Sequence, residues 1–171
     1  AVMSVELSTE MKIAEAASVI GSLYGEKPKT CIVLGSGLSP MADRCTIEAQ
    51  IRYTDIPYFP TPTTPGHSGV LLIARVGNVL TYLMNGRYHY YEGYSTQEIT
   101  FPFRVLASLG IRNLILTNAA GGMNPGMNPG DLMIIRDHLS MFCESPLRGP
   151  NLNDFGPRFP DQTHVYNPDF I

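Results

Sequence analysis

The sequence predicts an α/β protein with three layers, α/β/α, built around a central mixed β-sheet. Short apolar runs that suit buried strands alternate along the chain with segments whose apolar residues recur at helical spacing. The composition agrees, because 44% hydrophobic and 16% charged residues in a chain of 171 are ordinary for a globular α/β protein. No internal repeat or linker interrupts the pattern, so we expect a single domain over residues 1–171.

A helix and a strand are expected near the start of the chain. Residues 9–24 carry apolar side chains at spacings of three, which is a helical stripe, and Ser8 or Thr9 can cap its first turn. Residues 30–34 form a short, continuous apolar run that ends in a Gly-Ser-Gly turn. This pattern is typical of a central strand that feeds a tight turn.

A proline-rich segment and a hairpin follow. Residues 53–65 hold four prolines, so we expect a loop there and no regular structure. Residues 70–74 and 79–84 suit the two strands of a hairpin joined by a Gly-Asn turn. The second strand leads into Asn-Gly-Arg-Tyr-His, so Arg87 and His89 would emerge beyond its end on the same side of an extended backbone.

The next part of the chain continues the alternation of helix and strand. Ser-Thr-Gln-Glu at 95–98 has capping-box spacing and opens a helix that runs to Leu109. Pro102 should kink this helix or lie where its first turns end. Residues 113–117 predict another buried strand, which delivers the small-residue turn Asn-Ala-Ala-Gly-Gly, and a further strand is expected over residues 131–139.

Charge, cysteine content and hydropathy argue against several classes of protein. The formal net charge is -3 and the 12 Lys and Arg residues are scattered, so the basic stripe of a nucleic-acid-binding domain is missing. Three cysteines without a C-x-x-C spacing suit reduced thiols in a cytosolic protein. No segment approaches the roughly 20 apolar residues that span a bilayer, and the N-terminus is polar where a signal peptide would be apolar. We therefore expect a cytoplasmic protein with no membrane or nucleic-acid partner.

Three segments suited to anion binding each follow a predicted strand. The Gly-Ser-Gly turn at 35–37 lets backbone N–H groups approach an oxyanion, although such a turn alone is more often structural. Arg87 carries a permanent charge on a planar fork of donors, and His89 can hold or transfer a proton, so the pair suits an anion. The alternative interpretation is that Arg87 forms a surface salt bridge and His89 is a structural histidine. The Asn-Ala-Ala-Gly-Gly turn would open its amides toward the same sheet edge if the strands are parallel. Their convergence would form a pocket for a small anion.

Taken together, these segments resemble the homotrimeric type of purine nucleoside phosphorylase, in the nucleoside phosphorylase family. The resemblance runs in order over almost the whole chain, and its Gly-Arg-Tyr-His and Asn-Ala-Ala-Gly-Gly sequences are highly specific in combination. It implies a phosphorylase/hydrolase-like fold. The family pattern continues past Ile171, so we expect the C-terminal part of the fold to be absent from this chain. The segments that carry the resemblance are 35–38, 66–69, 86–94, 117–122 and 146–151.

The resemblance implies phosphorolysis: the reversible, phosphate-dependent cleavage of the N-glycosidic bond of a purine ribonucleoside or deoxyribonucleoside to free base and pentose 1-phosphate. Such an enzyme is a pentosyltransferase of purine salvage, here with a preference for 6-oxopurines. It implies no metal and no cofactor, because inorganic phosphate is a co-substrate. The physical task is to hold a polyanion beside a sugar that gains positive charge while the leaving purine gains negative charge.

Position by position, the resemblance assigns two sets of residues. Those that would bind phosphate are Ser36, His67, Arg87, His89 and the backbone of Ala119. Those that would contact the nucleoside are Tyr91, Ala119, Ala120, Gly121 and Phe159. Within the first set, Ser36, Arg87 and His89 are the catalytic residues, while Glu92 is interpreted as a local hydrogen-bond anchor. In a homotrimer, Phe159 would lean over the sugar in the neighbouring subunit's site.

Other hypotheses stay open at this point. A non-catalytic module that binds nucleoside or phosphate would keep the anion pocket without the base chemistry. A methylthioadenosine phosphorylase is similar in fold, but it resembles these segments less well. A Rossmann dehydrogenase is disfavoured, because position 40 carries Pro where the third Gly of its fingerprint would stand. The preference for 6-oxopurines is implied by the family alone, since in the family the residues that recognise the purine lie beyond Ile171.

Overall fold

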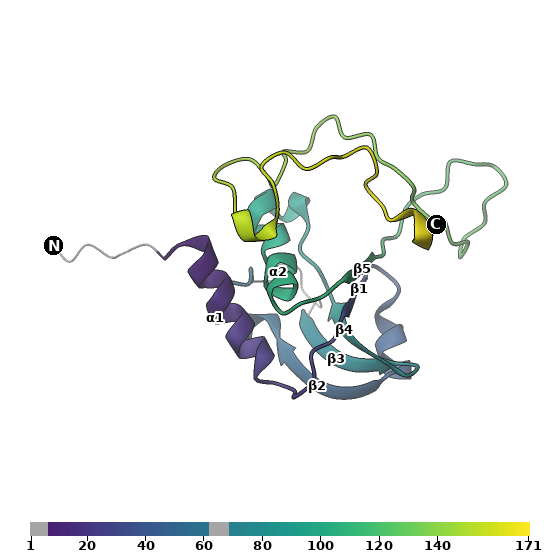
Figure 1. The fold of residues 1–171 in the computed structure, drawn as a ribbon. Coiled ribbons are helices and arrows are strands. Elements are labelled where there is room, and N and C mark those ends of the chain that lie inside the picture. Colours follow the sequence, from purple (N-terminus) through teal and green to yellow (C-terminus); the bar gives the residue numbers. More distant parts are fainter. Residues whose placement is uncertain (1–6, 62–68) are drawn as a thin grey trace. The chain divides into compact units, whose positions relative to one another are not determined.

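A five-stranded sheet in the order β2-β3-β4-β1-β5 forms the centre of the computed structural model, which describes residues 7–61 and 69–171 (Figure 1). β1 runs parallel to β4 and to β5, while β3 runs antiparallel to β2 and to β4. The predicted α/β class and mixed sheet are confirmed. Because β1, β4 and β5 are parallel, their carboxyl ends lie at one edge of the sheet. The strands are β1 (Thr30–Leu34), β2 (Thr46–Arg52), β3 (Val70–Val76), β4 (Val79–Asn85) and β5 (Asn113–Leu116).

The hairpin formed by β3 and β4 agrees with the sequence prediction. Its ladder closes at the pair Val76 and Val79, which leaves Gly77 and Asn78 as a two-residue turn. Gly77 has φ +59°, the left-handed conformation that such a turn requires. The hairpin therefore fixes the register of β4, and with it the position at which Arg87 leaves the sheet.

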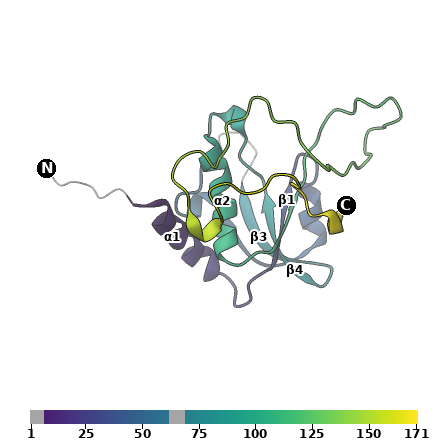
Figure 2. The same cartoon turned by 45° about the horizontal axis from the view of Figure 1, so that its top comes forward.

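Two α-helices, α1 (Thr9–Gly21) and α2 (Thr96–Ser108), pack against each other and cover one face of the sheet (Figure 1, Figure 2). The predicted capping box of α2 is present, because the Ser95 hydroxyl accepts from the Glu98 N–H and the Glu98 carboxylate accepts from the Ser95 N–H. α2 continues through Pro102, which is buried within it. The buried residues of the two helices are Ile13, Ala16, Ile20, Phe101, Pro102, Val105 and Leu106.

The other face of the sheet is covered by a 3-10 helix, η1 (Ser39–Arg44), which follows the turn after β1. Ala42 of η1 packs into a buried cluster with side chains from three neighbouring strands. Side chains alternate between the faces of a strand, so Leu34 points toward η1 while Val33 points toward the α-helices. The cluster consists of Leu34, Ala42, Leu72, Ala74 and Leu83.

β2 has no counterpart among the strands expected from the sequence. It is the edge strand beside β3, its residues are exposed or half-buried, and its register shifts between Ile47 and Ala49. An edge strand of this kind lacks the continuous apolar run that marks a buried strand. Residues 53–61, in the segment expected to be a loop, contain only the 3-10 helix η2 (Tyr53–Asp55).

The chain divides into two compact units, residues 1–119 and 120–171. The second unit contains the 3-10 helices η4 (Asn153–Phe155) and η5 (Pro168–Phe170) in otherwise irregular backbone. The strand predicted over 131–139 is therefore wrong. Its apolar side chains Leu132 and Leu139 are almost fully exposed, and no segment within 120–171 offers the backbone ladder that a strand needs. The single domain over 1–171 stays a prediction.

No helix within the described ranges has both the length and the apolar character that crossing a membrane would demand.

Candidate functional site

The residues that follow β1, β4 and β5 are joined by hydrogen bonds at the carboxyl edge of the sheet. Thr117, the first residue after β5, donates from Oγ1 to the Val33 carbonyl at 2.7 Å. The same oxygen accepts from the Gly35 N–H at 2.8 Å, and the Thr117 carbonyl accepts from Arg87 Nη1 at 2.8 Å. Gly35 and Arg87, from the first two anion-friendly segments, are therefore both joined to Thr117, the residue just before the third segment.

The turn after β1 owes its shape to its glycines. Gly35 is buried, and a Cβ atom placed on it would lie 2.5 Å from the Thr117 carbonyl oxygen, so any other residue would push the two segments apart. Gly37 has φ +84°, and the Leu38 N–H donates to the Gly35 carbonyl at 3.0 Å to close the turn. Ser36 lies exposed at the tip of this turn, where its hydroxyl can reach a ligand.

Arg87 is half-buried and held by two directed hydrogen bonds. The chain bends at Gly86, which has φ +103° and whose carbonyl accepts from the Tyr53 hydroxyl at 2.7 Å. Beyond the bend, Arg87 donates from Nη1 to Thr117 and from Nε to His89 Nε2 at 3.3 Å. Within the described part of the chain, Nη2 meets no acceptor, so the oriented guanidinium keeps donors for an anion.

Glu92 fixes His89 from the other side. The Glu92 carboxylate lies 2.7 Å from His89 Nδ1 and accepts from the His89 backbone N–H at 3.0 Å. His89 caps η3 (Tyr90–Glu92), so both contacts are local. Because Nδ1 faces a carboxylate and Nε2 accepts from Arg87, these partners assign the ring proton to Nδ1. The interpretation of Glu92 as a hydrogen-bond anchor is confirmed.

The remaining predicted residues of the first unit lie around this network. Tyr91 stacks on the His89 ring with centroids 4.7 Å apart, and its own side chain is 79% exposed. Ala119 is exposed and lies two residues after Thr117 in the sequence. His67 lies outside the described residues, so its expected role beside phosphate stays a prediction.

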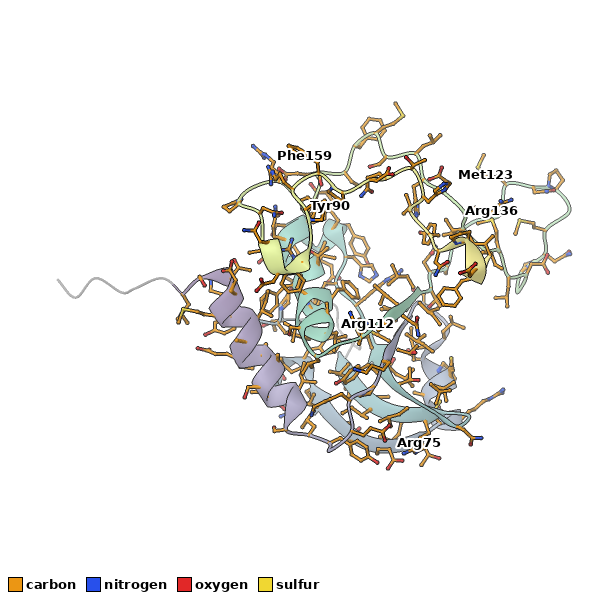
Figure 3. All side chains as sticks on the ribbon, in the orientation of Figure 1. Arg75, Tyr90, Arg112, Met123, Arg136 and Phe159 are labelled. Carbon is orange, nitrogen blue, oxygen red and sulfur yellow. The ribbon has the colours of Figure 1, made fainter. Side chains whose placement is uncertain are left out.

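The nucleoside residues predicted in the second unit are exposed. Ala120 and Gly121 lie in irregular backbone, and Phe159, labelled in Figure 3, is 87% exposed. The Arg158 guanidinium lies 5.9 Å from the centroid of the Phe159 ring. Phe159 also lines a pocket of about 440 Å³ within this unit, together with Ser145, Leu147, Arg148, Arg158, Pro160 and Gln162.

Two residues of the network were not among the predicted site residues. Tyr53 is almost completely buried beneath the bend at Gly86, and a Cβ atom on Gly69 would lie 2.2 Å from its ring. Its sequence context, at the start of a proline-rich segment, gives no sign of this role. Thr117 does leave a signal in the sequence, because a hydroxyl residue directly after a strand can continue the hydrogen bonding of that strand through its side chain.

The described residues include no group of three or more His, Cys, Asp and Glu side chains that could hold a metal ion.

The fold and the strand ends joined at one edge of the sheet can be compared with known protein families. A family model described as the Phosphorylase superfamily matches residues 29–171. The chain belongs to this superfamily.

Within the superfamily, the chain is similar to purine nucleoside phosphorylases, which confirms the resemblance found in its sequence. It is 46% identical over 158 residues to purine nucleoside phosphorylase 1 of Bacillus subtilis (strain 168), covering 92% of this chain and 58% of that protein. It is 42% identical over 147 residues to the purine nucleoside phosphorylase of Bos taurus, covering 84% of this chain and 51% of the relative. The chain thus spans little more than half the length of these relatives.

Solved structures agree. The purine nucleoside phosphorylase of Schistosoma mansoni in a complex with BCX-34 superposes with a TM-score of 0.85 at 36% identity, covering 96% of this chain and 62% of that one. Isoform 2 from the same organism, solved in complex with cytosine and ribose-1-phosphate, gives a TM-score of 0.80 at 39% identity, covering 92% of this chain and 56% of that one.

Proposed function

We propose that this protein acts as a purine nucleoside phosphorylase, a pentosyltransferase that cleaves purine (deoxy)ribonucleosides with inorganic phosphate to give free base and (deoxy)ribose 1-phosphate. The observation that carries this proposal is the linkage of three strand ends around the half-buried Arg87. The names of its relatives support the same activity, and the expected physiological context is purine salvage in the cytoplasm.

Phosphate is the ligand that suits the donors of this edge. Arg87 is permanently charged, and its guanidinium fork matches two oxygens of a tetrahedral anion. The Ser36 hydroxyl and the Ala119 backbone N–H would add neutral donors from the two neighbouring strand ends, and His67 would join from the segment before β3. Held there, phosphate serves as the nucleophile at the anomeric carbon, and its negative charge stabilises the oxocarbenium-like transition state.

His89 is suited to a precise role because both of its ring nitrogens have partners. The Glu92 carboxylate accepts a hydrogen bond from the Nδ1–H of His89, which leaves the unprotonated Nε2 facing Arg87. When phosphate takes the Arg87 donors, Nε2 becomes free to bind a protonated phosphate oxygen. We propose that His89, with Arg87 and Ser36, forms the catalytic group.

The nucleoside would lie against small and aromatic residues. Tyr91 offers a hydroxyl to the ribose, while Ala119, Ala120 and Gly121 leave room for sugar and base. Exposed Phe159 suits a contribution to the site of a neighbouring subunit, so we propose a homotrimer. Preference for 6-oxopurines belongs to the same proposal. No cofactor is proposed, since phosphate is a co-substrate.

The test is phosphate-dependent release of hypoxanthine from inosine by the full natural chain. We expect Arg87→Ala to lower kcat/KM by about a hundred-fold or more, because it removes the charged donor of the nucleophile's site. Arg112→Ala is the matched control, because Arg112 lies exposed just before the amino end of β5, away from the carboxyl edge (Figure 3). We expect this control to retain wild-type activity.

Other outcomes would favour the alternatives. Equal cleavage of inosine without phosphate would indicate a hydrolase. Faster phosphorolysis of methylthioadenosine than of inosine would indicate a methylthioadenosine phosphorylase. Calorimetric binding of phosphate and inosine with no turnover would indicate a non-catalytic binding module.

A further inference from the structure

We propose that Thr117 is a positioning residue for phosphate: its hydroxyl fixes the turn that carries Ser36, and its carbonyl fixes the guanidinium of Arg87. This inference rests on the proposed function, because the anion in question is the phosphate co-substrate. Thr117 acts through its two neighbours and not by touching the anion.

The hydroxyl of Thr117 continues the sheet where the backbone ladder stops. The ladder between β1 and β5 ends at the pair Val33 and Leu116, so Thr117 is the first residue beyond it. There the hydroxyl accepts from the buried Gly35 N–H and donates to the Val33 carbonyl, which also accepts from the Thr117 N–H at 3.3 Å. A buried N–H needs an acceptor, so the hydroxyl holds Gly35, and hence the start of the Ser36 turn, in place.

The carbonyl of Thr117 connects this turn to Arg87. It lies 2.5 Å from the position that a Cβ of Gly35 would occupy, an approach that only glycine permits, and it accepts from Arg87 Nη1 at 2.8 Å. Because the hydroxyl and the carbonyl belong to one residue, loss of the hydroxyl's hydrogen bonds to Gly35 and Val33 also allows the carbonyl that holds Arg87 to move. Thr117 thus sets the distance between the neutral donors of one strand end and the charged donors of another.

Thr81 provides a matched comparison. It is 1% exposed, and its hydroxyl donates to the Val79 carbonyl of its own strand at 3.1 Å. In the parallel ladder Thr81 pairs with Thr30, the first residue of β1, so it lies away from the carboxyl edge. Thr81→Val therefore removes a buried hydroxyl without touching the candidate site.

The experiment measures steady-state phosphorolysis of inosine by the full natural chain with phosphate and nucleoside varied separately. Thr117→Val keeps the shape of the side chain but removes both hydroxyl hydrogen bonds, and we expect it to raise the KM for phosphate by about ten-fold or more. The KM for inosine should change by less than about three-fold. Thr117→Ser restores the hydroxyl and should return the phosphate KM to within about three-fold of wild type, and Thr81→Val should match wild type.

Each outcome decides the inference. A wild-type phosphate KM in folded Thr117→Val, or a Thr117→Ser variant as impaired as Thr117→Val, overturns it. If Thr117→Val does not fold, Gly35→Ala takes its place, because the added Cβ displaces the Thr117 carbonyl and leaves the Thr117 hydroxyl in the protein. A raised KM for phosphate in this variant supports the inference, and an unchanged KM overturns it. If wild type shows no phosphate-dependent cleavage, the proposed function fails. In that case, calorimetry with inorganic phosphate tests the role of Thr117 separately. We expect Thr117→Val to bind phosphate more weakly than wild type, and equal binding would overturn the inference.

Discussion

At the scale of single residues, the candidate site is a chain of hydrogen bonds in which each polar group orients the next. Glu92 holds His89, His89 accepts from Arg87, and Arg87 donates to the carbonyl of Thr117. Networks of this kind are sensitive to the loss of any member, because a partly buried polar group then loses its partner. The same residues that could be named from short sequence motifs therefore depend on partners that the motifs do not contain.

Removing Glu92 tests this dependence. Glu92→Ala frees the His89 ring and its backbone N–H, so we expect phosphorolysis to fall by about ten-fold and the free energy of unfolding to fall by about 1 kcal/mol. Activity assays and urea denaturation measure the two effects. Glu48→Ala is the control: it removes the Arg75 ion pair, a partly exposed bridge, and should leave activity unchanged. Full activity in Glu92→Ala would show that His89 needs no anchor.

At the scale of elements, helix ends were predictable where capping is local. The capping box of α2 uses Ser95 and Glu98, three residues apart, so its sequence signature and its structure coincide. α1 ends at Gly21, earlier than the predicted end at residue 24, and the Lys27 ammonium donates to the Gly21 and Tyr24 carbonyls. Lys27 lies beyond the end of the helix, so the apolar stripe gives no sign of this contact.

The capping box should contribute measurably to stability. Ser95→Ala removes the acceptor for the Glu98 N–H, and we expect the free energy of unfolding to fall by about 1 kcal/mol. Ser108→Ala, at the last residue of the same helix, is the matched control and should cost less, because its hydroxyl only adds a bond to the Val105 carbonyl. Urea denaturation of both variants measures the difference. Equal losses would mean that the box adds nothing beyond an ordinary surface hydroxyl.

At the scale of the whole molecule, the buried core carries groups that resist ionisation. Burial raises the pKa of the Cys31 thiol to about 12 and that of the Tyr82 hydroxyl to about 12, and it also raises the pKa of Tyr53 and Tyr88. The hydroxyls of Tyr82 and Tyr88 have no hydrogen-bond partner among the described residues. Folding therefore favours the protonated form of each group.

Stability should accordingly fall in alkaline solution. The unfolded chain loses these protons from about pH 9 for cysteine and about pH 10 for tyrosine, while the folded chain keeps them to higher pH. Between those values and about pH 12 the folded state binds more protons, so the free energy of unfolding decreases as pH rises. Urea denaturation from pH 8 to pH 11 measures the decrease. Tyr82→Phe should make the decrease shallower, and an identical pH dependence in this variant would contradict the assignment.

The strands that the sequence predicted are those marked by a pattern within a single short segment. The strands β1, β3, β4 and β5 were each marked by a continuous apolar run. β1, β3 and β4 are inner strands of the sheet, as such a run predicts. β5 is the edge strand beside β1 and its Leu114, Ile115 and Leu116 are exposed, so the burial predicted for it is wrong. The edge strand β2 carries no such run. The strand expected over 131–139 has the apolar pattern but no partner within its unit, and an unpaired strand does not satisfy its backbone.

The sequence by itself determined which residues could bind an anion and that each follows a strand, because strand-forming runs, glycine turns and the chemistry of Ser36, Arg87 and His89 are properties of short segments. It also determined the superfamily, through the combination of those segments. Only the tertiary structure decided that β1 lies between β4 and β5, which brings their carboxyl ends together and places Thr117 between Gly35 and Arg87. The physical reason is that strand order depends on contacts between residues more than 80 positions apart, such as that of Gly35 with Thr117, and no short segment encodes such a contact.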